Sequence, residues 1–91
     1  MNYIPHSDVI KNKKGNVEIS LNIADCIKGD FEVFSKENEV VVIKKNHFKS
    51  VFIIPEERRY DFNKISTKRK DGLLIITIPK RTRQWKDWTV L

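Results

Sequence analysis

An alternation of apolar and polar residues between Val17 and Ile23 constrains the fold more than any other feature of the sequence. Every second residue of this segment is apolar, and the residues between them are polar. Successive side chains of a strand point to opposite faces, whereas the pattern of a helix repeats about every 3.6 residues. The segment therefore predicts a strand with one buried face and one solvated face.

Further short segments of the chain have extended character. We predict strands over residues 31–35, 40–43, 48–54, 64–68 and 73–78, with a weak strand at residues 9–10. The β-branched run at residues 40–43 suits a strand that is covered on both faces or lies near an edge. Because no long amphipathic helix accompanies them, the segments predict an all-β fold, an antiparallel sandwich of six or seven strands.

Residues that favour turns lie between these segments. Pro55 lacks a backbone donor and ends one strand, and Asp71 with Gly72 marks a tight turn. In the polar, arginine-bearing connection after Pro55, Tyr60 and Phe62 are the expected apolar anchors. The sandwich domain is expected to span residues 9–80, between a flexible end at residues 1–8 and a tail at residues 81–91.

Composition bounds the organisation and location of the chain. Its 91 residues are enough for one domain, and 40% hydrophobic with 33% charged residues is ordinary for a globular protein. No apolar run approaches the roughly 20 residues of a membrane-spanning helix, and residues 1–8 lack the pattern of a signal peptide. We therefore expect a cytoplasmic protein without a membrane partner.

The chemistry of a catalytic or metal site is weakly represented. Cys26 is the single cysteine, which excludes an internal disulfide and a cysteine-rich zinc site. His6 and His47 are the only histidines, and no glycine-rich phosphate loop is present. We expect no metal, no cofactor and no enzymatic activity.

The charge balance is basic, with a formal net charge of +6. Clusters at residues 11–14, 68–70 and 80–83 could neutralise phosphates, but solvated lysines at strand ends also protect sheet edges from aggregation. Nucleic-acid binding is therefore kept only as an alternative.

The segment from residue 65 to residue 80 resembles the closing signature of the α-crystallin family of small heat-shock proteins. That signature reads I-x-A, three variable residues and N-G-x-L-x-I-x-x-P-K; here Thr67 takes the place of Ala and Asp71 that of Asn. Residues 48–55 are similar to the family's F-x-R-x-F-x-L-P strand, with Ser50 at the basic position. The resemblance covers roughly residues 9–80.

This resemblance implies an immunoglobulin-like sandwich of the α-crystallin type that holds partly unfolded or extended polypeptides without ATP. In the family, a groove between the strands at residues 31–35 and 65–67 receives an extended segment. The resemblance therefore assigns peptide binding to Phe31, Val33, Ile65 and Thr67. The alternative is that these four residues belong to the core.

Two departures from the family pattern bear on assembly. Where many members carry a long dimerisation loop, this chain has only Asn46 and His47, both tolerant of positive φ. The resemblance then implies either a monomer or a homodimer through the edge of the 48–54 strand, at Phe48, Ser50 and Phe52.

The second departure is the absence of the family's C-terminal I-x-I motif, for which only four apolar residues of the tail could substitute. These residues are Trp85, Trp88, Val90 and Leu91. They are expected to contact the chain's own groove, a second subunit or a client. A different class of function also stays open, a co-chaperone or adaptor like the related CS domains, which share the sandwich but recognise folded partners.

Overall fold

The alternating segment forms strand β2 (Val17–Asn22), which pairs with β7 (Leu73–Ile78) at the centre of a four-stranded sheet. In the computed structural model, which describes residues 5–23 and 31–81, β1 (Ser7–Lys11) and β6 (Ser66–Lys70) complete this sheet in the order β1-β2-β7-β6. All its pairings are antiparallel.

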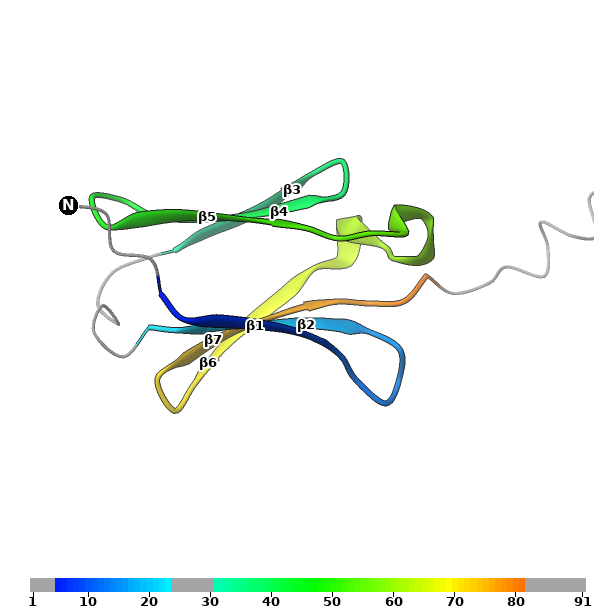
Figure 1. Ribbon diagram of the computed structural model, residues 1–91, viewed down its shortest axis with the longest axis horizontal. Coiled ribbons are helices and arrows are strands. Elements are labelled where there is room, and N and C mark those ends of the chain that lie inside the picture. The colour runs from blue at the N-terminus through cyan, green and yellow to red at the C-terminus, as the bar shows by residue number, and fades with distance from the viewer. Residues whose placement is uncertain (1–4, 24–30, 82–91) are drawn as a thin grey trace, which may run out of the picture.

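A second, three-stranded sheet lies over the first, and Figure 1 shows the two as separate layers. It contains β3 (Glu32–Lys36), β4 (Glu39–Lys44) and β5 (Phe48–Ile53), in that order and all antiparallel. β4 is the central strand, and three consecutive valines in it are buried. The described residues therefore form the predicted antiparallel sandwich, with seven strands of the six or seven expected.

The core lies between the two inner faces. Cross-strand pairs of β2 and β7 supply its floor, and Ile19 and Ile76, which face each other in register, are both fully buried. Burial of one such side chain stabilises the fold by about 1.5–3 kcal/mol. The buried apolar cluster consists of Val17, Ile19, Leu21, Ile23, Val40, Val42, Phe48, Ile54, Tyr60, Leu74, Ile76 and Ile78.

Two tight turns show how local sequence fixes the register. Asp71 and Gly72 have φ values of 52° and 79°, so β6 and β7 are joined by a two-residue turn with both residues in the left-handed region. Of the two residues expected to tolerate positive φ before β5, only Asn46 adopts it, at 68°.

The connection from β5 to β6 corrects one predicted boundary. It contains two short 3-10 helices, η2 (Glu57–Arg59) and η3 (Phe62–Lys64), and the Asp61 carboxylate accepts a hydrogen bond from the Asn63 N–H at 3.1 Å. Because η3 takes up the chain through residue 64, the strand predicted over residues 64–68 was placed too early. It begins at Ser66 and runs directly into the tight turn.

The expected anchors of this connection lie where the sequence suggests. Tyr60 is 2% exposed, its ring lies beneath the Lys11 ammonium at 6.0 Å, and its backbone forms an isolated bridge with Lys80. Phe62 is half-buried against the core. Tyr60 thus ties the connection to the four-stranded sheet at two points, the end of β1 and the residues just after β7.

The ends of the chain need two further statements. β1 begins at Ser7, two residues before the expected domain start at residue 9. The tail with Trp85, Trp88, Val90 and Leu91 lies outside the described residues, as does Cys26. Within residues 5–23 and 31–81, no helix is long and apolar enough to cross a membrane.

The core predicts a test by substitution. Replacing Ile76 with Ala should lower the free energy of unfolding by about 2–5 kcal/mol, because a cavity would remain between the sheets. The same change at Ile53, which is 68% exposed, should cost less than about 1 kcal/mol. Urea unfolding followed by circular dichroism measures both, and equal effects would contradict this account of the core.

Candidate functional site

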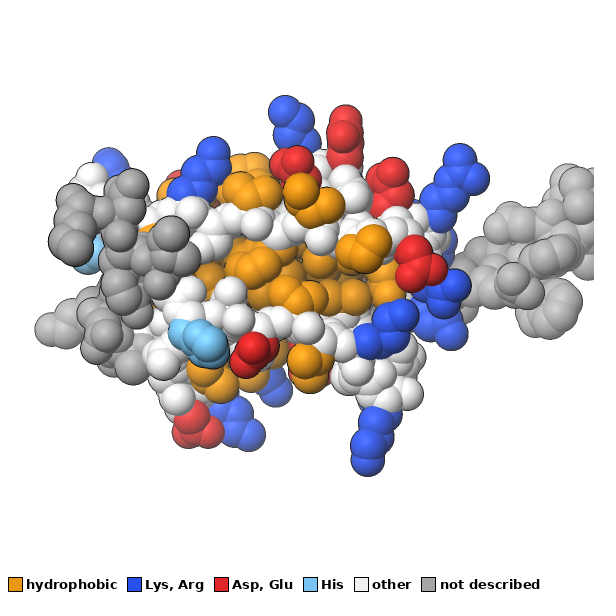
Figure 2. All heavy atoms as spheres, in the orientation of Figure 1, with side chains coloured by type: hydrophobic (Ala, Val, Ile, Leu, Met, Phe, Trp, Pro, Cys, Tyr) orange, Lys and Arg blue, Asp and Glu red, His pale blue; other side chains and the backbone are white. Residues whose placement is uncertain are grey.

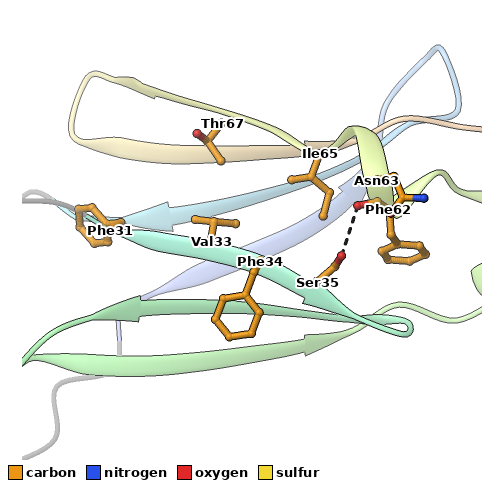
Figure 3. Close-up of a pocket in the computed structure, with 8 residues that line it drawn as sticks. All are labelled: Phe31, Val33, Phe34, Ser35, Phe62, Asn63, Ile65 and Thr67. Atoms are coloured by element: carbon orange, nitrogen blue, oxygen red, sulfur yellow. Dashed lines mark hydrogen bonds between the residues drawn. The ribbon is translucent and has the colours of Figure 1, made fainter.

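A groove of about 530 Å³ lies between β3 and β6, where two sheet edges face each other (Figure 3). β3 ends the three-stranded sheet and β6 ends the four-stranded sheet. Edge strands present backbone N–H and C=O groups that their own sheet does not use. All residues of β6 are exposed, so this wall is open to solvent along its whole length.

The four residues assigned to peptide binding from the resemblance all line this groove. Phe31 and Val33 come from the start of the β3 wall, and both are half-buried against the core. Ile65 and Thr67 lie on the opposite wall, as Figure 3 shows. Residues 31–33 and 65–67 are thus brought together from distant parts of the sequence.

Four more residues line the groove that the sequence did not single out for binding: Phe34, Ser35, Phe62 and Asn63. Phe34 points outward from β3 and is 44% exposed, so strand alternation placed it on the solvent face. An aromatic residue at an outward strand position was the one feature of the sequence that could have marked Phe34 as a binding residue. Phe62 was expected only as an anchor, and η3 turns it towards the groove (Figure 3).

Contacts between the walls close the end of the groove next to η3. The Ser35 hydroxyl donates to the Phe62 carbonyl oxygen at 3.3 Å, which joins β3 to η3 (Figure 3). Asp61, which caps η3, donates its backbone N–H to the Pro79 carbonyl at 2.9 Å. This end of the groove is therefore tied to both sheets.

The other end is formed by the Phe31 ring, which cations flank. The Arg69 guanidinium lies 4.9 Å and the Lys44 ammonium 5.3 Å from its centroid. The Phe48 ring packs at a tilt, with centroids 5.9 Å apart. Cation–π and aromatic contacts of this kind hold a ring in place, so Phe31 is a fixed part of the groove and not a loose side chain.

The lining suits binding better than catalysis. The eight side chains that line the groove are aromatic, aliphatic, hydroxyl or amide groups, and none of them is ionisable. His6 and His47 are both exposed and lie outside this lining. Among residues 5–23 and 31–81, no group of three or more His, Cys, Asp or Glu side chains could hold a metal ion.

The predicted dimer edge lies on the opposite side of the sandwich. Phe48, Ser50 and Phe52 point inward from β5, and Phe48 is only 7% exposed. What β5 offers at this edge is therefore its backbone. Figure 2 views the side where β5 and β1 end the two sheets, and apolar side chains are visible between them.

The basic clusters do not all lie on one surface. Residues 11–14 end β1 and begin the connection to β2, whereas residues 68–70 end β6. Lys11 aligns with Val17 at one end of the four-stranded sheet, and Lys70 aligns with Leu73 at the other. These two clusters therefore lie at opposite ends of this sheet. Lys80 of the third cluster lies near the first, since its backbone N–H donates to the Asn16 side chain at 2.8 Å.

Comparison with known proteins identifies the family to which this fold belongs. Curated proteins gave no significant match. Among solved structures, a small heat-shock protein from Xylella fastidiosa, described as having a distinct high order structure, is similar with a TM-score of 0.71 and 19% identity over 90% of each chain. The model of the Hsp20/alpha crystallin family matches residues 6–89, nearly the whole sequence. The chain therefore belongs to the Hsp20/alpha crystallin family.

Proposed function

We propose that this protein is an ATP-independent chaperone that holds partly unfolded or extended polypeptide segments in the groove between β3 and β6. One observation carries the proposal: Phe31, Val33, Ile65 and Thr67, assigned to peptide binding from sequence, line a single groove between two sheet edges. The proposed activity is non-catalytic. A cytoplasmic location remains a prediction.

The proposed binding mode is β-augmentation. An extended guest segment would pair with a strand edge through its backbone, while alternate apolar side chains enter the space between Val33 and Ile65. The backbone contacts are independent of guest sequence, and the lining favours apolar side chains. Unfolded chains of many sequences would therefore be recognised.

The magnitudes favour weak and reversible binding. Burial of one large apolar side chain contributes about 1.5–3 kcal/mol, and a dissociation constant of about 1 µM requires about 8 kcal/mol. Ordering an extended guest also costs conformational entropy. One groove of this size would hold a client only transiently, so effective protection would need several contacts on each client.

The tail is proposed as a second contact, through Trp85, Trp88, Val90 and Leu91. Arg81 donates its backbone N–H to the Arg59 carbonyl at 2.7 Å and its side chain to the Tyr60 carbonyl at 3.3 Å. The chain thus leaves the domain beside the closed end of the groove. Residues 82–91 could span roughly 33 Å when extended, against roughly 14 Å between Phe31 and Ser35, so the tail can reach this groove or that of a second copy.

A homodimer through the β5 edge is also proposed. This edge lies on the side of the sandwich away from the groove, so pairing there would leave the groove accessible. The CS-domain alternative is less well supported, because the family match covers residues 6–89 and is to small heat-shock proteins. Nucleic-acid binding is less well supported, because the 68–70 cluster lies at the opposite end of the sheet from residues 11–14 and Lys80.

Filling the groove should impair the proposed activity. Thr67 is exposed and faces the groove, so Thr67→Arg should obstruct it without removing a core contact. We expect the variant to need at least about threefold more protein to suppress light scattering by reduced insulin, in the absence of ATP.

Ser66→Arg provides a matched control. Ser66 is also exposed, and its replacement by Arg adds the same charge to the same strand. Ser66 pairs with Thr77, however, so its side chain points away from the core and the groove. This variant should protect insulin as the parent does. Equal losses in both variants, or no protection by the parent at a large excess, would contradict the proposal.

Tryptophan fluorescence tests the tail. Trp85 and Trp88 are the only tryptophans in the chain, so the emission reports on the tail alone. If they lie in the groove, their emission should move to longer wavelength in Thr67→Arg and stay unchanged in Ser66→Arg, because water replaces an apolar environment. Identical spectra for the parent, both variants and a free peptide of residues 82–91 would refute tail docking.

A further inference from the structure

The outward face of the three-stranded sheet carries an apolar row at its centre. Strand register aligns Phe34 of β3, Val41 of β4 and Val51 of β5 side by side. Phe34 is 44% and Val51 47% exposed, and Val41, between them, is only 6% exposed. The row therefore forms a continuous apolar surface across all three strands.

The two neighbouring rows combine apolar and charged residues. On one side Glu32, Ile43 and Lys49 are aligned, and on the other Lys36, Glu39 and Ile53 are aligned. We call these nine aligned residues the outer face. Ile53 is 68% exposed, the highest value among the exposed large hydrophobic residues of the described chain.

The other sheet of the sandwich has a different outward face. Its outward row at Ser20 contains Asp8, Ile75 and Lys68, with one apolar residue among four. Sandwich sheets normally place polar residues outward in this way. The three-stranded sheet departs from that rule, and contiguous exposed apolar patches usually mark an interaction surface.

The charge of the outer face favours a second copy of the chain over a nucleic acid as its partner. The outer face holds two acidic and two basic residues, so it is neutral on a chain whose net charge is +6. A nucleic acid would gain little from a neutral face, whereas a second copy of the chain would meet no net repulsion there. The positions of the four charges on the outer face also restrict how two copies can be oriented against each other.

We propose that the outer face binds the outer face of a second copy, related by a two-fold axis that runs along the Phe34–Val41–Val51 row. This axis places each residue of the row against itself, as an isologous interface requires. It also places Glu32 opposite Lys36 of the second copy, and Lys36 opposite its Glu32. In the same two rows, the axis places Ile43 opposite the second copy's Glu39 and Lys49 opposite its Ile53. Lys49 is then a diagonal neighbour of that Glu39, and Ile43 a diagonal neighbour of that Ile53.

The interface is small. Three strands about 4.8 Å apart, each contributing residues over about 14 Å, give a footprint of about 200 Å², against roughly 800 Å² per partner in a stable complex. Association is therefore weak, with a dissociation constant on the order of 100 µM, and depends on protein concentration. Its centre at Val41 lies in neither the groove nor the β5 edge, and Phe34 is the one residue of the outer face that also lines the groove.

Charge reversal tests this geometry in the full chain. Sedimentation velocity between about 10 and 500 µM should show self-association, which Lys36→Glu should weaken about tenfold because like charges then face each other twice. Glu32→Lys alone should do the same. The double variant Lys36→Glu/Glu32→Lys should recover the parent's affinity to within about twofold, since the pairs re-form with exchanged signs.

Three controls separate this interface from others. Lys68→Glu changes the net charge as Lys36→Glu does, but on the other sheet, and should leave self-association unchanged. Val51→Asp should abolish the association by placing charge in the apolar row. A parent that stays monomeric, a dimer indifferent to Val51→Asp, or a double variant no better than the single variants would each overturn the proposal; the last two results would point to the β5 edge or to the chain's own tail.

Discussion

The pairing of β2 with β7 is the interaction on which the rest of the structure depends. Ile19 and Ile76 meet at its centre, both fully buried, and the apolar side of each strand forms the floor of the core. β1 and β6 contribute no buried residue of their own. They hold their places through backbone hydrogen bonds to this central pair, so the β6 wall of the groove depends on β7 for its position.

The groove exists because the core is not covered at the edges of the two sheets. Where β3 and β6 end their sheets, no further strand among residues 5–23 and 31–81 covers the inward side chains, and Val33 and Ile65 stay half-buried at the border of the core. Covering these residues would make the domain more stable, but it would also leave no strand edge for a guest. The proposed function and the incomplete core are thus consequences of one arrangement of edges.

Sequence predicted the central elements well, because their signals are local. The strand predicted over residues 73–78 and the turn predicted at Asp71-Gly72 anticipate β7 and its hairpin, and the structure agrees. The start of β6 was wrong because a cap at Asp61 shifts the chain, which no alternation reveals. Phe34 was missed as a groove residue because period-two patterns assign one face to each side chain, whereas a residue at an edge can serve the face and the border together.

The attachment of the last described residues has a mechanical consequence. Arg81 is bonded to Arg59 and Tyr60, and Pro79 is bonded to Asp61, so the chain leaves the domain through the segment that also closes one end of the groove. A load on the chain beyond Arg81 would act first on these bonds. Since these hydrogen bonds lie between the exit of the chain and β7, the connection between η2 and η3 would take up tension there before the buried sheet did.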